Sequence, residues 1–491
     1  MPEKTTKVFL GNSPWKRDGA YGVRAGSRWP HFEFDGTPYM PFPFFLAYAT
    51  SVLKQNNFTT LAVDAIAEGI SEKEFISRIV AFAPDIIVLE ISSASIGVDI
   101  QMLQSLRKIY GRDFPIIWCG AHSWSENEPD VLQQVSEIDF FIKGEYELAL
   151  LDLCKKLETG ERDSFGDVKG LFWRDRSRKS IDNPKRNLVE NLETFPLPER
   201  DDFPMNRYME AAGGLPWPNL QMWASRGCPF RCNFCVWPQF MYNGRNYRTR
   251  NPKALLDEVE IAVKKYGMKS VYFDDDTFNI GKKRIIEISD EFIKRKLGIP
   301  WGAMSRADTF DRVVFEKMVE SGLKFIKFGV ESGDQKIVDR MEKALNLNKV
   351  RESMKWAKEL GVKTHLTFSF GHIGETMESA KKTIDFALEL SPDSLQFSLI
   401  QPFPGSDLYK DLEKMGHLDS KDYAKYDGYT SSVISTDTLS SKQLEKILET
   451  ANRKWQRHTL MKIFKTQNWS KLKWAATHPQ HAFRRVMEIM G

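Results

Sequence analysis

The 491-residue chain has few cysteines and no long apolar run. It contains five cysteines, three of them clustered, so a disulfide framework is not expected and a reducing cytoplasm is indicated. The longest apolar stretch, residues 40–53, includes Pro41 and Pro43 and is too short to cross a bilayer. Residues 1–10 lack a signal-peptide pattern, which favours a cytoplasmic protein.

A strong excess of charge of one sign is also lacking. The formal net charge is +4, which is no nucleic-acid-binding footprint, so a nucleic-acid partner is not expected. Low-complexity segments and short-period repeats are absent from the sequence. With 42% hydrophobic and 28% charged residues, the composition is that of a globular protein. The length predicts roughly two to four domains.

Most of the cysteines lie in one stretch, residues 223–238, which reads WASRGCPFRCNFCVWP. They are Cys228, Cys232 and Cys235, spaced CxxxCxxC. Sulfur ligands that lie so near one another in the sequence select zinc or an iron–sulfur cluster as the bound metal. A closed site takes four protein ligands, but Cys119 and Cys154 are far away in the sequence. Three thiolates on a four-iron cube leave one iron open to a substrate or cosubstrate; a zinc knuckle with a distant fourth ligand is the alternative.

This cysteine run resembles the signature of the radical S-adenosylmethionine (SAM) enzymes, and the aromatic Phe234 before the third cysteine also fits that family. The resemblance implies that the open iron of a 4Fe-4S cluster chelates the amino and carboxylate groups of SAM. Reductive cleavage then gives a 5'-deoxyadenosyl radical. An electron donor such as flavodoxin or ferredoxin is implied as a partner.

Six strand-plus-helix units are predicted between residues 217 and 415. The strands are expected near residues 220–225, 270–273, 301–305, 325–329, 364–370 and 394–400. The helices are expected near residues 253–266, 282–294, 310–321, 348–360, 377–390 and 407–415. Six units are two short of a full eight-fold barrel. The radical SAM resemblance implies an open six-unit (β/α) partial barrel, whose gap admits a large substrate or a neighbouring domain.

The loops after these strands are polar or glycine-rich, and chemistry in parallel barrels is placed there. The resemblance assigns SAM contacts to Asp274, Asp275, Asp276, Ser305, Arg306, Glu331 and Ser332. In this assignment the DDDTF stretch lies beside the SAM amino group. Arg306 pairs with the SAM carboxylate as a bidentate fork, and Glu331 and Ser332 bond the ribose. For any single loop, an ordinary helix cap is the alternative. No catalytic residue is assigned.

An α/β domain is predicted before the barrel, over residues 1–160. Strands near residues 7–11, 60–63, 86–90, 116–119 and 140–142 alternate with helices near 44–55, 72–82, 98–110 and 128–135. Such alternation implies a parallel sheet with helices on both faces. Ligands of these sheets bind at the carboxyl ends of the strands.

This segment resembles the Rossmann-like cobalamin-binding domain that precedes many radical SAM domains. Residues 64–69 line up with the DxHxxG signature, but Ile66 stands where the cobalt-ligating histidine would be. The GExE stretch of the family is matched by residues 144–147. The cobalamin contacts carried over are Asp64, Gly69, Ser92, Ser93, Gly120 and Ala121. Cobalamin is therefore expected to bind without this histidine on cobalt. A Rossmann-like domain with no cofactor is the alternative.

Three further segments are less specific. Residues 161–216 are proline-rich and charged and predict a linker, with a small hairpin near Gly170–Arg174. Residues 21–31 form a long loop rich in arginine, glycine and aromatics that could grip an acidic group. Residues 416–491 predict a helical segment, with an amphipathic helix over 440–463. The basic, Trp-bearing tail predicts either peripheral membrane contact or a helical cap on the barrel, and its His478 and His481 are expected at the surface.

Taken together, the resemblances imply a cobalamin-dependent radical SAM enzyme that methylates an unactivated carbon of a large or apolar metabolite. The subgroup it resembles most includes the anaerobic magnesium-protoporphyrin ester cyclases, so oxidative ring formation is the second hypothesis. A non-catalytic cobalamin or iron–sulfur binding protein is the third. Aromatic residues near the expected mouth favour a small-molecule or lipid-like substrate, namely Trp15, Trp29, Phe234, Trp237, Phe240 and Tyr242.

Overall fold

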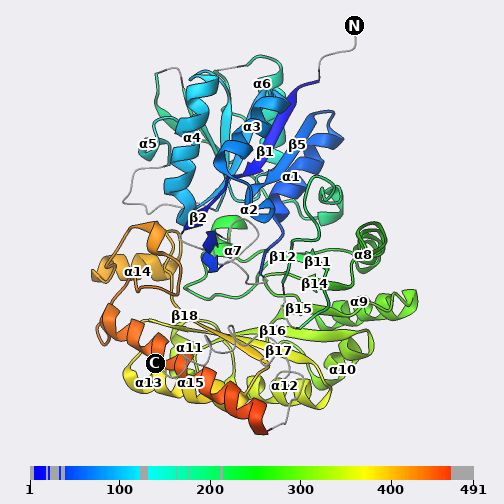
Figure 1. The fold of residues 1–491 in the computed structure, drawn as a ribbon, viewed down its shortest axis with the longest axis vertical. Helices are drawn as coiled ribbons and strands as arrows, with labels where there is room; N and C mark the ends of the chain where they lie inside the picture. Colours follow the sequence, from blue (N-terminus) through cyan, green and yellow to red (C-terminus); the bar gives the residue numbers. More distant parts are fainter. Residues whose placement is uncertain are drawn as a thin grey trace.

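The computed structural model describes residues 5–17, 20–22, 32–34, 39–121, 131–161, 163–175, 177–210 and 214–465. It contains two large sheets, one above the other in Figure 1, with the short helix α7 (Val236–Met241) between them. Residues 23–31 of the loop predicted at 21–31 lie outside the described residues, as does the tail after residue 465 with its tryptophans and histidines.

The first sheet has seven strands in the order β10-β9-β8-β7-β6-β1-β5. Their bounds are β1 Lys7–Asn12, β5 Thr59–Asp64, β6 Ile86–Ser92, β7 Ile116–Ala121, β8 Phe140–Lys143, β9 Leu171–Arg174 and β10 Ser180–Asp182. The first five of these are parallel, and β9 and β10 add an antiparallel hairpin. This hairpin was predicted near Gly170–Arg174 and extends the first sheet into the segment predicted as a linker.

Helices cover both faces of this sheet, as the alternating pattern predicted. The helices are α1 Phe44–Gln55, α2 Ala65–Glu68, α3 Glu72–Phe82, α4 Ile96–Tyr110, α5 Val131–Gln134 and α6 Glu147–Glu158. Strand β1 shows why both faces of the sheet need helices. Phe9 packs into a core with α3 and α4 on one face, whereas Val8 and Leu10 pack with α1 and α6 on the other. Parallel strands buried on both faces read as continuous apolar runs for this reason.

Counted along the chain, the five parallel strands lie in the spatial order 2-1-3-4-5, which corresponds to β5-β1-β6-β7-β8. The direction in which strands are added to the sheet reverses between β1 and β6. Open α/β sheets bind ligands at the carboxyl ends of strands beside this reversal, the switch point. A small three-stranded sheet follows β1, with strands β2 Lys16–Arg17, β3 Ala20–Gly22 and β4 Phe32–Phe34.

The second sheet has six parallel strands in chain order, β11-β14-β15-β16-β17-β18, which confirms the predicted open barrel. Its strands are β11 Asn219–Met222, β14 Ser270–Phe273, β15 Trp301–Ser305, β16 Leu323–Glu331, β17 Lys363–Phe370 and β18 Ser394–Leu399. The helices are α8 Pro252–Tyr266, α9 Lys282–Arg295, α10 Arg312–Glu320, α11 Gln335–Arg340, α12 Leu347–Glu359, α13 Met377–Leu390 and α14 Asp407–Met415.

Alternation along these strands separates the two faces of the second sheet. Ile326 and Phe328 of β16 pack into the core with the surrounding helices, whereas Phe325 packs with Tyr272, Leu215 and Met304 on the inner face. The helix α15 (Ser441–Lys465) lies against α13, β17 and β18, so the predicted amphipathic helix covers the barrel.

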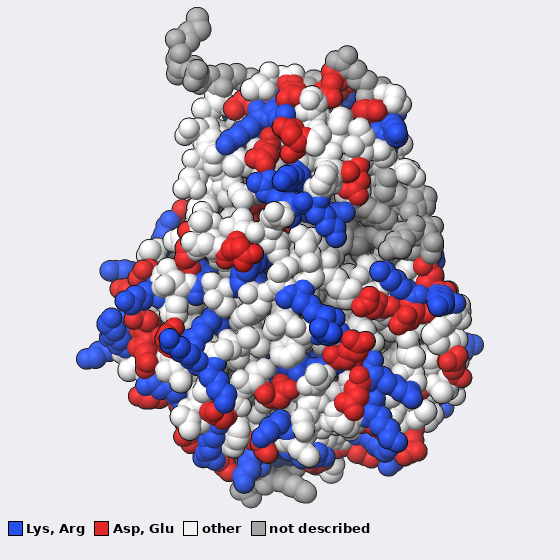
Figure 2. Space-filling view, turned by 180° about the vertical axis from the view of Figure 1, so that it is seen from behind, with Lys and Arg blue, Asp and Glu red and all other residues white. Residues whose placement is uncertain are grey.

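No helix in the described part of the chain has the length and apolar character of a membrane span. Acidic and basic side chains intermingle over the lower part of the face in Figure 2.

A hairpin connects the first barrel strand to the cysteine run. Strands β12 Ser225–Gly227 and β13 Tyr247–Thr249 pair antiparallel on either side of residues 228–246. Gly227 has φ +89°, and a Cβ there would lie 1.9 Å from the Asn246 carbonyl oxygen. Only glycine therefore allows the hairpin to close directly before Cys228.

Candidate active site

The three clustered cysteines lie in the loop between β12 and α7, and all three are half-buried. Cys232 and Cys235 line a cavity of about 350 Å³ together with Arg231 and Arg245. The Cys228 sulfur lies 3.5 Å from Thr277 Oγ1, after β14. Burial raises the pKa of Cys235, and the neighbouring Cys232 and Cys228 raise it further. Bound metal is what would stabilise thiolates packed together in this way.

Among the described residues, no three His, Cys, Asp or Glu side chains converge as the ligands of one metal ion would. A four-iron cube binds its three cysteines through three different irons, so its ligands need not converge on one point. The donor set of three thiolates on one loop fits such a cluster. Cys119 on β7 and Cys154 on α6 are buried in the first domain, and burial raises the pKa of both thiols.

The acidic stretch after β14 fastens the cysteine loop to the barrel. Asp275 is fully buried, and its carboxylate accepts hydrogen bonds from the Ala224 amide at 3.1 Å and from the Ser225 hydroxyl. Asp276 accepts a hydrogen bond from the Gly227 amide at 3.1 Å. The structure thus gives these two carboxylates a positioning role in front of Cys228, which the predicted SAM contact did not include.

Arg306 is already held by protein groups. Its guanidinium donates to both carboxylate oxygens of Asp308, at 3.0 and 2.9 Å, and to the carbonyls of Lys343 and Ala344. It also lies 3.6 Å over the ring of Phe230, inside the cysteine loop. Arg306 therefore supports the cysteine loop, and its pairing with the SAM carboxylate stays a prediction.

The two serines predicted to contact SAM differ in their surroundings. Ser332 shares a hydrogen bond of 3.0 Å with Thr383 and accepts one from the Asp334 amide at 3.2 Å. The Ser305 hydroxyl, at the end of β15, is buried and has no hydrogen-bond partner among the described residues. A buried hydroxyl without a partner is costly, so Ser305 is the one of the two that is ready to bond a ligand.

Glu331 has the left-handed backbone conformation, φ +69°, which is rare for a residue with a side chain. Its carboxylate pairs with Lys343 at 3.1 Å and accepts a hydrogen bond from Ser369 at 3.4 Å. Lys343 is buried, and its ammonium lies 5.7 Å from the centre of the Phe234 ring in the cysteine loop. Burial lowers the pKa of Lys343, but Glu331 and, to a smaller extent, Cys232 raise it, so the net shift is upward. Strained backbone of this kind gathers at functional sites.

Two residues of this network, Lys343 and His372, were not singled out from the sequence. His372 is buried after β17, with its Nε2 atom 2.8 Å from Ser369 Oγ and its ring against Phe234. Burial, together with the charge of Lys343, lowers the pKa of His372 to about 3, so the ring is neutral. Lys343 follows α11 in a segment with no local motif, and only the fold brings it to the cysteines.

At the first sheet, the residues that line up with the DxHxxG signature lie at the end of an outer strand, and their contact with cobalamin stays a prediction. Asp64 ends the outer strand β5, where its carboxylate caps α2 and accepts a hydrogen bond from the Tyr208 hydroxyl at 3.0 Å. The switch point lies one strand away, between β1 and β6. There Asn12 Oδ1 and Ser13 Oγ are buried and have no partner among the described residues. Their polar character at the end of a buried strand was the available sequence signal.

The other residues carried over from the cobalamin domain surround this edge. Ser92 ends β6 and shares a hydrogen bond of 3.0 Å with Ser95, which donates to Asp99 at 2.6 Å. Gly120 on β7 has φ +117°, and a Cβ there would lie 2.6 Å from the Ile91 carbonyl oxygen. Ser93 follows the end of β6, Ala121 is the last residue of β7, and Gly69 is the C-cap of α2. Small and polar residues with unpartnered buried oxygens fit a bulky polar cofactor.

Ile66, in the position of the missing histidine, belongs to a small apolar cluster with Trp15 and Ala94. These side chains come from the ends of three strands, β5, β1 and β6. The face that a histidine ligand would need is therefore apolar here.

Two buried ion pairs connect the first sheet to the cysteine hairpin. Glu145 binds Arg248 of β13, with the longer of two contacts at 3.0 Å, and Glu147 binds Arg226 of β12 at 2.8 Å. A Cβ at Gly144 would lie 3.2 Å from the Met241 carbonyl oxygen of α7. The GExE stretch of the first domain thus contacts the elements on both sides of the cysteines.

A loop with three clustered cysteines, on an open six-stranded parallel sheet, is the arrangement expected of a radical SAM domain. Residues 224–387 match the family profile of the radical SAM superfamily. An uncharacterized methyltransferase of Pyrococcus horikoshii is 29% identical over 409 residues, which cover 83% of this chain and 86% of that protein. The anaerobic magnesium-protoporphyrin IX monomethyl ester cyclase of Rubrivivax gelatinosus is 26% identical over 413 residues, covering 82% and 71%.

Among solved structures, the cobalamin-dependent SAM radical enzyme OxsB, with aqua-cobalamin and SAM bound, superimposes with a TM-score of 0.73. The sequence identity is 16%, and the match covers 99% of this chain and 72% of that one, so the likeness concerns the fold. The chain is a radical SAM protein related to cobalamin-dependent radical SAM methyltransferases and to magnesium-protoporphyrin cyclases.

Proposed function

We propose that the protein is a cobalamin-dependent radical SAM methyltransferase acting on an unactivated carbon of a large, partly apolar small molecule. The observation that carries the proposal is the pair of buried ion pairs, Glu145–Arg248 and Glu147–Arg226. They bind a cobalamin-type domain to the hairpin that presents the cysteines. Transfer between two cofactors needs both held at one carbon, and a rigid connection supports this.

Cys228, Cys232 and Cys235 would hold the 4Fe-4S cluster. Bound there, the cluster and SAM supply a 5'-deoxyadenosyl radical that removes a hydrogen atom from carbon. The chain's own residues position and enclose this chemistry. Asp275 and Asp276 hold the backbone before Cys228, and Ser305 offers its unpartnered hydroxyl to SAM. Reduction needs an external donor such as flavodoxin or ferredoxin.

Cobalamin would lie at the switch point, over Asn12, Ser13 and the Ser92-Ser93 pair. When bound, it supplies the methyl group that is transferred. The apolar cluster of Ile66, Trp15 and Ala94 supports binding without a protein imidazole from this position.

The inner face of the second sheet supports a substrate with both apolar and polar parts. Phe325 and Tyr272 form an apolar patch on it. Lys327, on the same face of β16, pairs with Glu210 at 3.2 Å, and His365 of β17 lies beside it. The His365 Nε2 atom is buried without a partner among the described residues, and burial lowers the pKa of this ring. This mixed lining supports the large and at least partly apolar substrate that was predicted from the sequence.

Anaerobic product analysis tests the proposal. The reconstituted, reduced protein is incubated with trideuteromethyl-labelled SAM and with metabolites of enzymes encoded by neighbouring genes. We expect a product that carries the label on carbon. A product that has lost hydrogen and closed a ring without label would favour the cyclase hypothesis. Absence of 5'-deoxyadenosine with every candidate would contradict both and favour a binding protein.

A further inference from the structure

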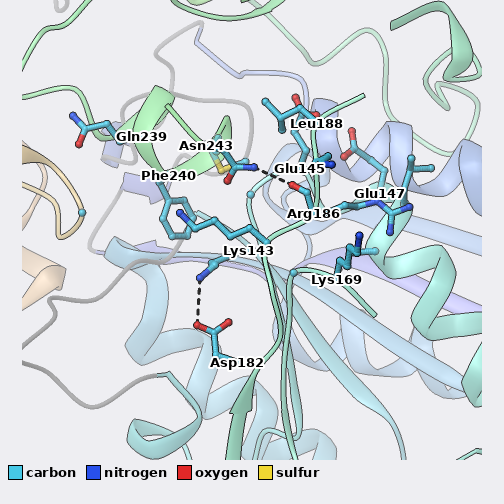
Figure 3. Close-up of a pocket in the computed structure, with 18 of the residues that line it drawn as sticks. Lys143, Glu145, Glu147, Lys169, Asp182, Arg186, Leu188, Gln239, Phe240 and Asn243 are labelled. Atoms are coloured by element: carbon cyan, nitrogen blue, oxygen red, sulfur yellow. Dashed lines mark hydrogen bonds and ion pairs between the residues drawn. The ribbon is translucent and has the colours of Figure 1, made fainter. Parts of the chain in front are cut away.

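A second, larger cavity lies beside the cysteine loop, and the proposed function assigns no ligand to it. Its volume is about 690 Å³, and its walls come from the end of β8, the hairpin β9–β10, the chain after β10, α7 and α14 (Figure 3). Gln239 of α7 also lines the cavity that contains Cys232 and Cys235. The two cavities are therefore neighbours on α7, which begins directly after Cys235.

Positive charge dominates the wall of the larger cavity. Its cationic side chains are Lys143, Lys169, Lys185, Arg186, Lys410 and Lys414. The carboxylates in the wall are Glu145, Glu147, Asp182 and Glu413. Three of them are bound closely by cations: Glu145 by Arg248, Glu147 by Arg226 and Glu413 by Lys421. Arg248, Arg226 and Lys421 are not among the lining residues, so these three pairs involve none of the cations of the wall. Of those cations, Arg186 pairs with Asp152 at 2.5 Å and Lys143 lies 3.9 Å from Asp182.

Lys143 is the deepest of these cations. Its ammonium lies 4.3 Å over the ring of Phe172 and 3.9 Å from Asp182, and Figure 3 shows it between Asp182 and Phe240. Burial lowers the pKa of Lys143, Asp182 raises it and the nearby Lys185 lowers it, so the net shift is downward. Like charges that converge in a concave site favour an anion. Among the described residues, Lys169, Lys185 and Lys414 make no ion pair.

The remaining wall is apolar and partly aromatic. Phe240 and Met241 of α7 face Leu188, Val189 and Phe195 from the linker across the cavity. A ring stacked on Phe240 would extend from the cationic group around Lys143, which Figure 3 shows beside it. The volume is within the range of sites for cofactor-sized and drug-sized ligands.

We propose that this cavity binds a phosphate-bearing small molecule of nucleotide size, with its phosphate between Lys143 and Lys185 and its apolar ring against Phe240. The phosphate can belong to a separate metabolite or to the nucleotide tail of cobalamin. In both cases the ligand contacts α7 and so adjoins the cysteine loop. The site does not depend on which carbon the enzyme methylates.

Isothermal titration with inorganic pyrophosphate tests the site on the full-length reconstituted protein. We expect binding that weakens with salt, and that weakens at least tenfold in the double variant K143Q/K185Q. The control variant K283Q/K355Q removes the same charge from the exposed lysines of α9 and α12 and should bind as wild type does. K185Q alone, at an exposed side chain, provides the comparison if the double variant does not fold. Pyrophosphate that fails to bind wild type, or that binds all variants equally, would overturn the proposal.

Cobalamin and cobinamide, which lacks the nucleotide and its phosphate, distinguish the two sources. If K143Q/K185Q binds both as wild type does, the phosphate belongs to a separate molecule. If it loses affinity for cobalamin and keeps it for cobinamide, the phosphate is that of cobalamin. Each of these results supports the site, provided that pyrophosphate binding has been lost.

Discussion

Glu147 and Arg226 form a 2.8 Å ion pair whose side chains are 0% and 3% exposed, and which joins α6 of the first domain to β12 before the cysteines. The Arg226 guanidinium lies over the rings of Tyr48, Phe195 and Trp223. Burial lowers the pKa of Arg226, but Glu147 and Glu145 raise it by more, so the guanidinium stays charged. Glu147 is the nearer of the two carboxylates and Glu145 lies 3.6 Å away, so this buried charge makes the domain junction sensitive to mutation of Glu147.

Glu147→Gln should therefore destabilise the protein. It leaves the buried Arg226 charge with Glu145, at 3.6 Å, as its remaining carboxylate. Breaking a buried pair outright costs about 3–5 kcal/mol, so the loss should reach at most this range. The denaturant midpoint of unfolding measures the loss. Glu316→Gln is the matched control because its pair with Arg312 has nearly the same length but is 48% and 46% exposed. That change should cost less than about 1 kcal/mol. Equal effects of the two substitutions would refute the importance of the junction.

Ser305→Ala should weaken SAM binding without lowering stability. The Ser305 hydroxyl has no partner among the described residues, so its removal breaks no bond within them. Loss of one hydrogen bond to SAM corresponds to about 1 kcal/mol, or roughly a fivefold higher Kd. Ser332→Ala is the contrasting variant, since it breaks bonds to Thr383 and Asp334 and should lower the thermal midpoint. Unchanged SAM affinity in Ser305→Ala would remove this residue from the site.

Glu375 should make stability depend on pH. Burial raises its pKa to about 7 from an ordinary value of 4.5, and its Oε1 atom has no partner among the described residues. Because the folded state holds this proton more tightly, the contribution is fully present below about pH 4.5. It is lost as pH rises through about 7, by roughly 3 kcal/mol in all. Unfolding midpoints at pH 5 and pH 8 should show the loss in wild type and much less of it in Glu375→Gln. The same pH dependence in both proteins would contradict this assignment.

Iron and sulfide content should follow the clustered cysteines alone. Replacing Cys228, Cys232 or Cys235 by alanine should abolish a content of about four iron and four sulfide per chain, as expected for a 4Fe-4S cluster. Cys154→Ala should retain it, because this thiol is buried in α6 and burial raises its pKa. Stoichiometric zinc without labile sulfide in the wild-type protein would support the zinc alternative instead.

The order of strands and helices could be predicted because it depends on local patterns. Residues 44–55, 72–82 and 301–305 were predicted with the bounds that the structure shows, since apolar periodicity and flanking turn residues mark their ends. The CxxxCxxC spacing is also local. The order of strands in the sheet is not a local property. It places the switch point at Asn12 and Ser13, and Asp64 lies one strand away from that point.

Residue type at a loop could be predicted, but the partner of each side chain could not. Arg306 was correctly placed after β15, yet its binding to Asp308 depends on the packing of that loop. Lys343 comes to Cys232 only through the arrangement of β16 and α11, so no sequence pattern announces it. Ser305 and Ser332 both follow or end a strand in the sequence, and only their hydrogen-bond partners in the folded chain distinguish them.

The central claim is that this chain uses SAM both as a radical source and as a methyl donor through cobalamin. The most direct test is to measure 5'-deoxyadenosine and S-adenosylhomocysteine together, in the reduced, reconstituted protein with and without added cobalamin. We predict both products with cobalamin, 5'-deoxyadenosine alone without it, and neither in Cys228→Ala. Absence of 5'-deoxyadenosine in wild type, or absence of S-adenosylhomocysteine when cobalamin is bound and reduced, would contradict the account.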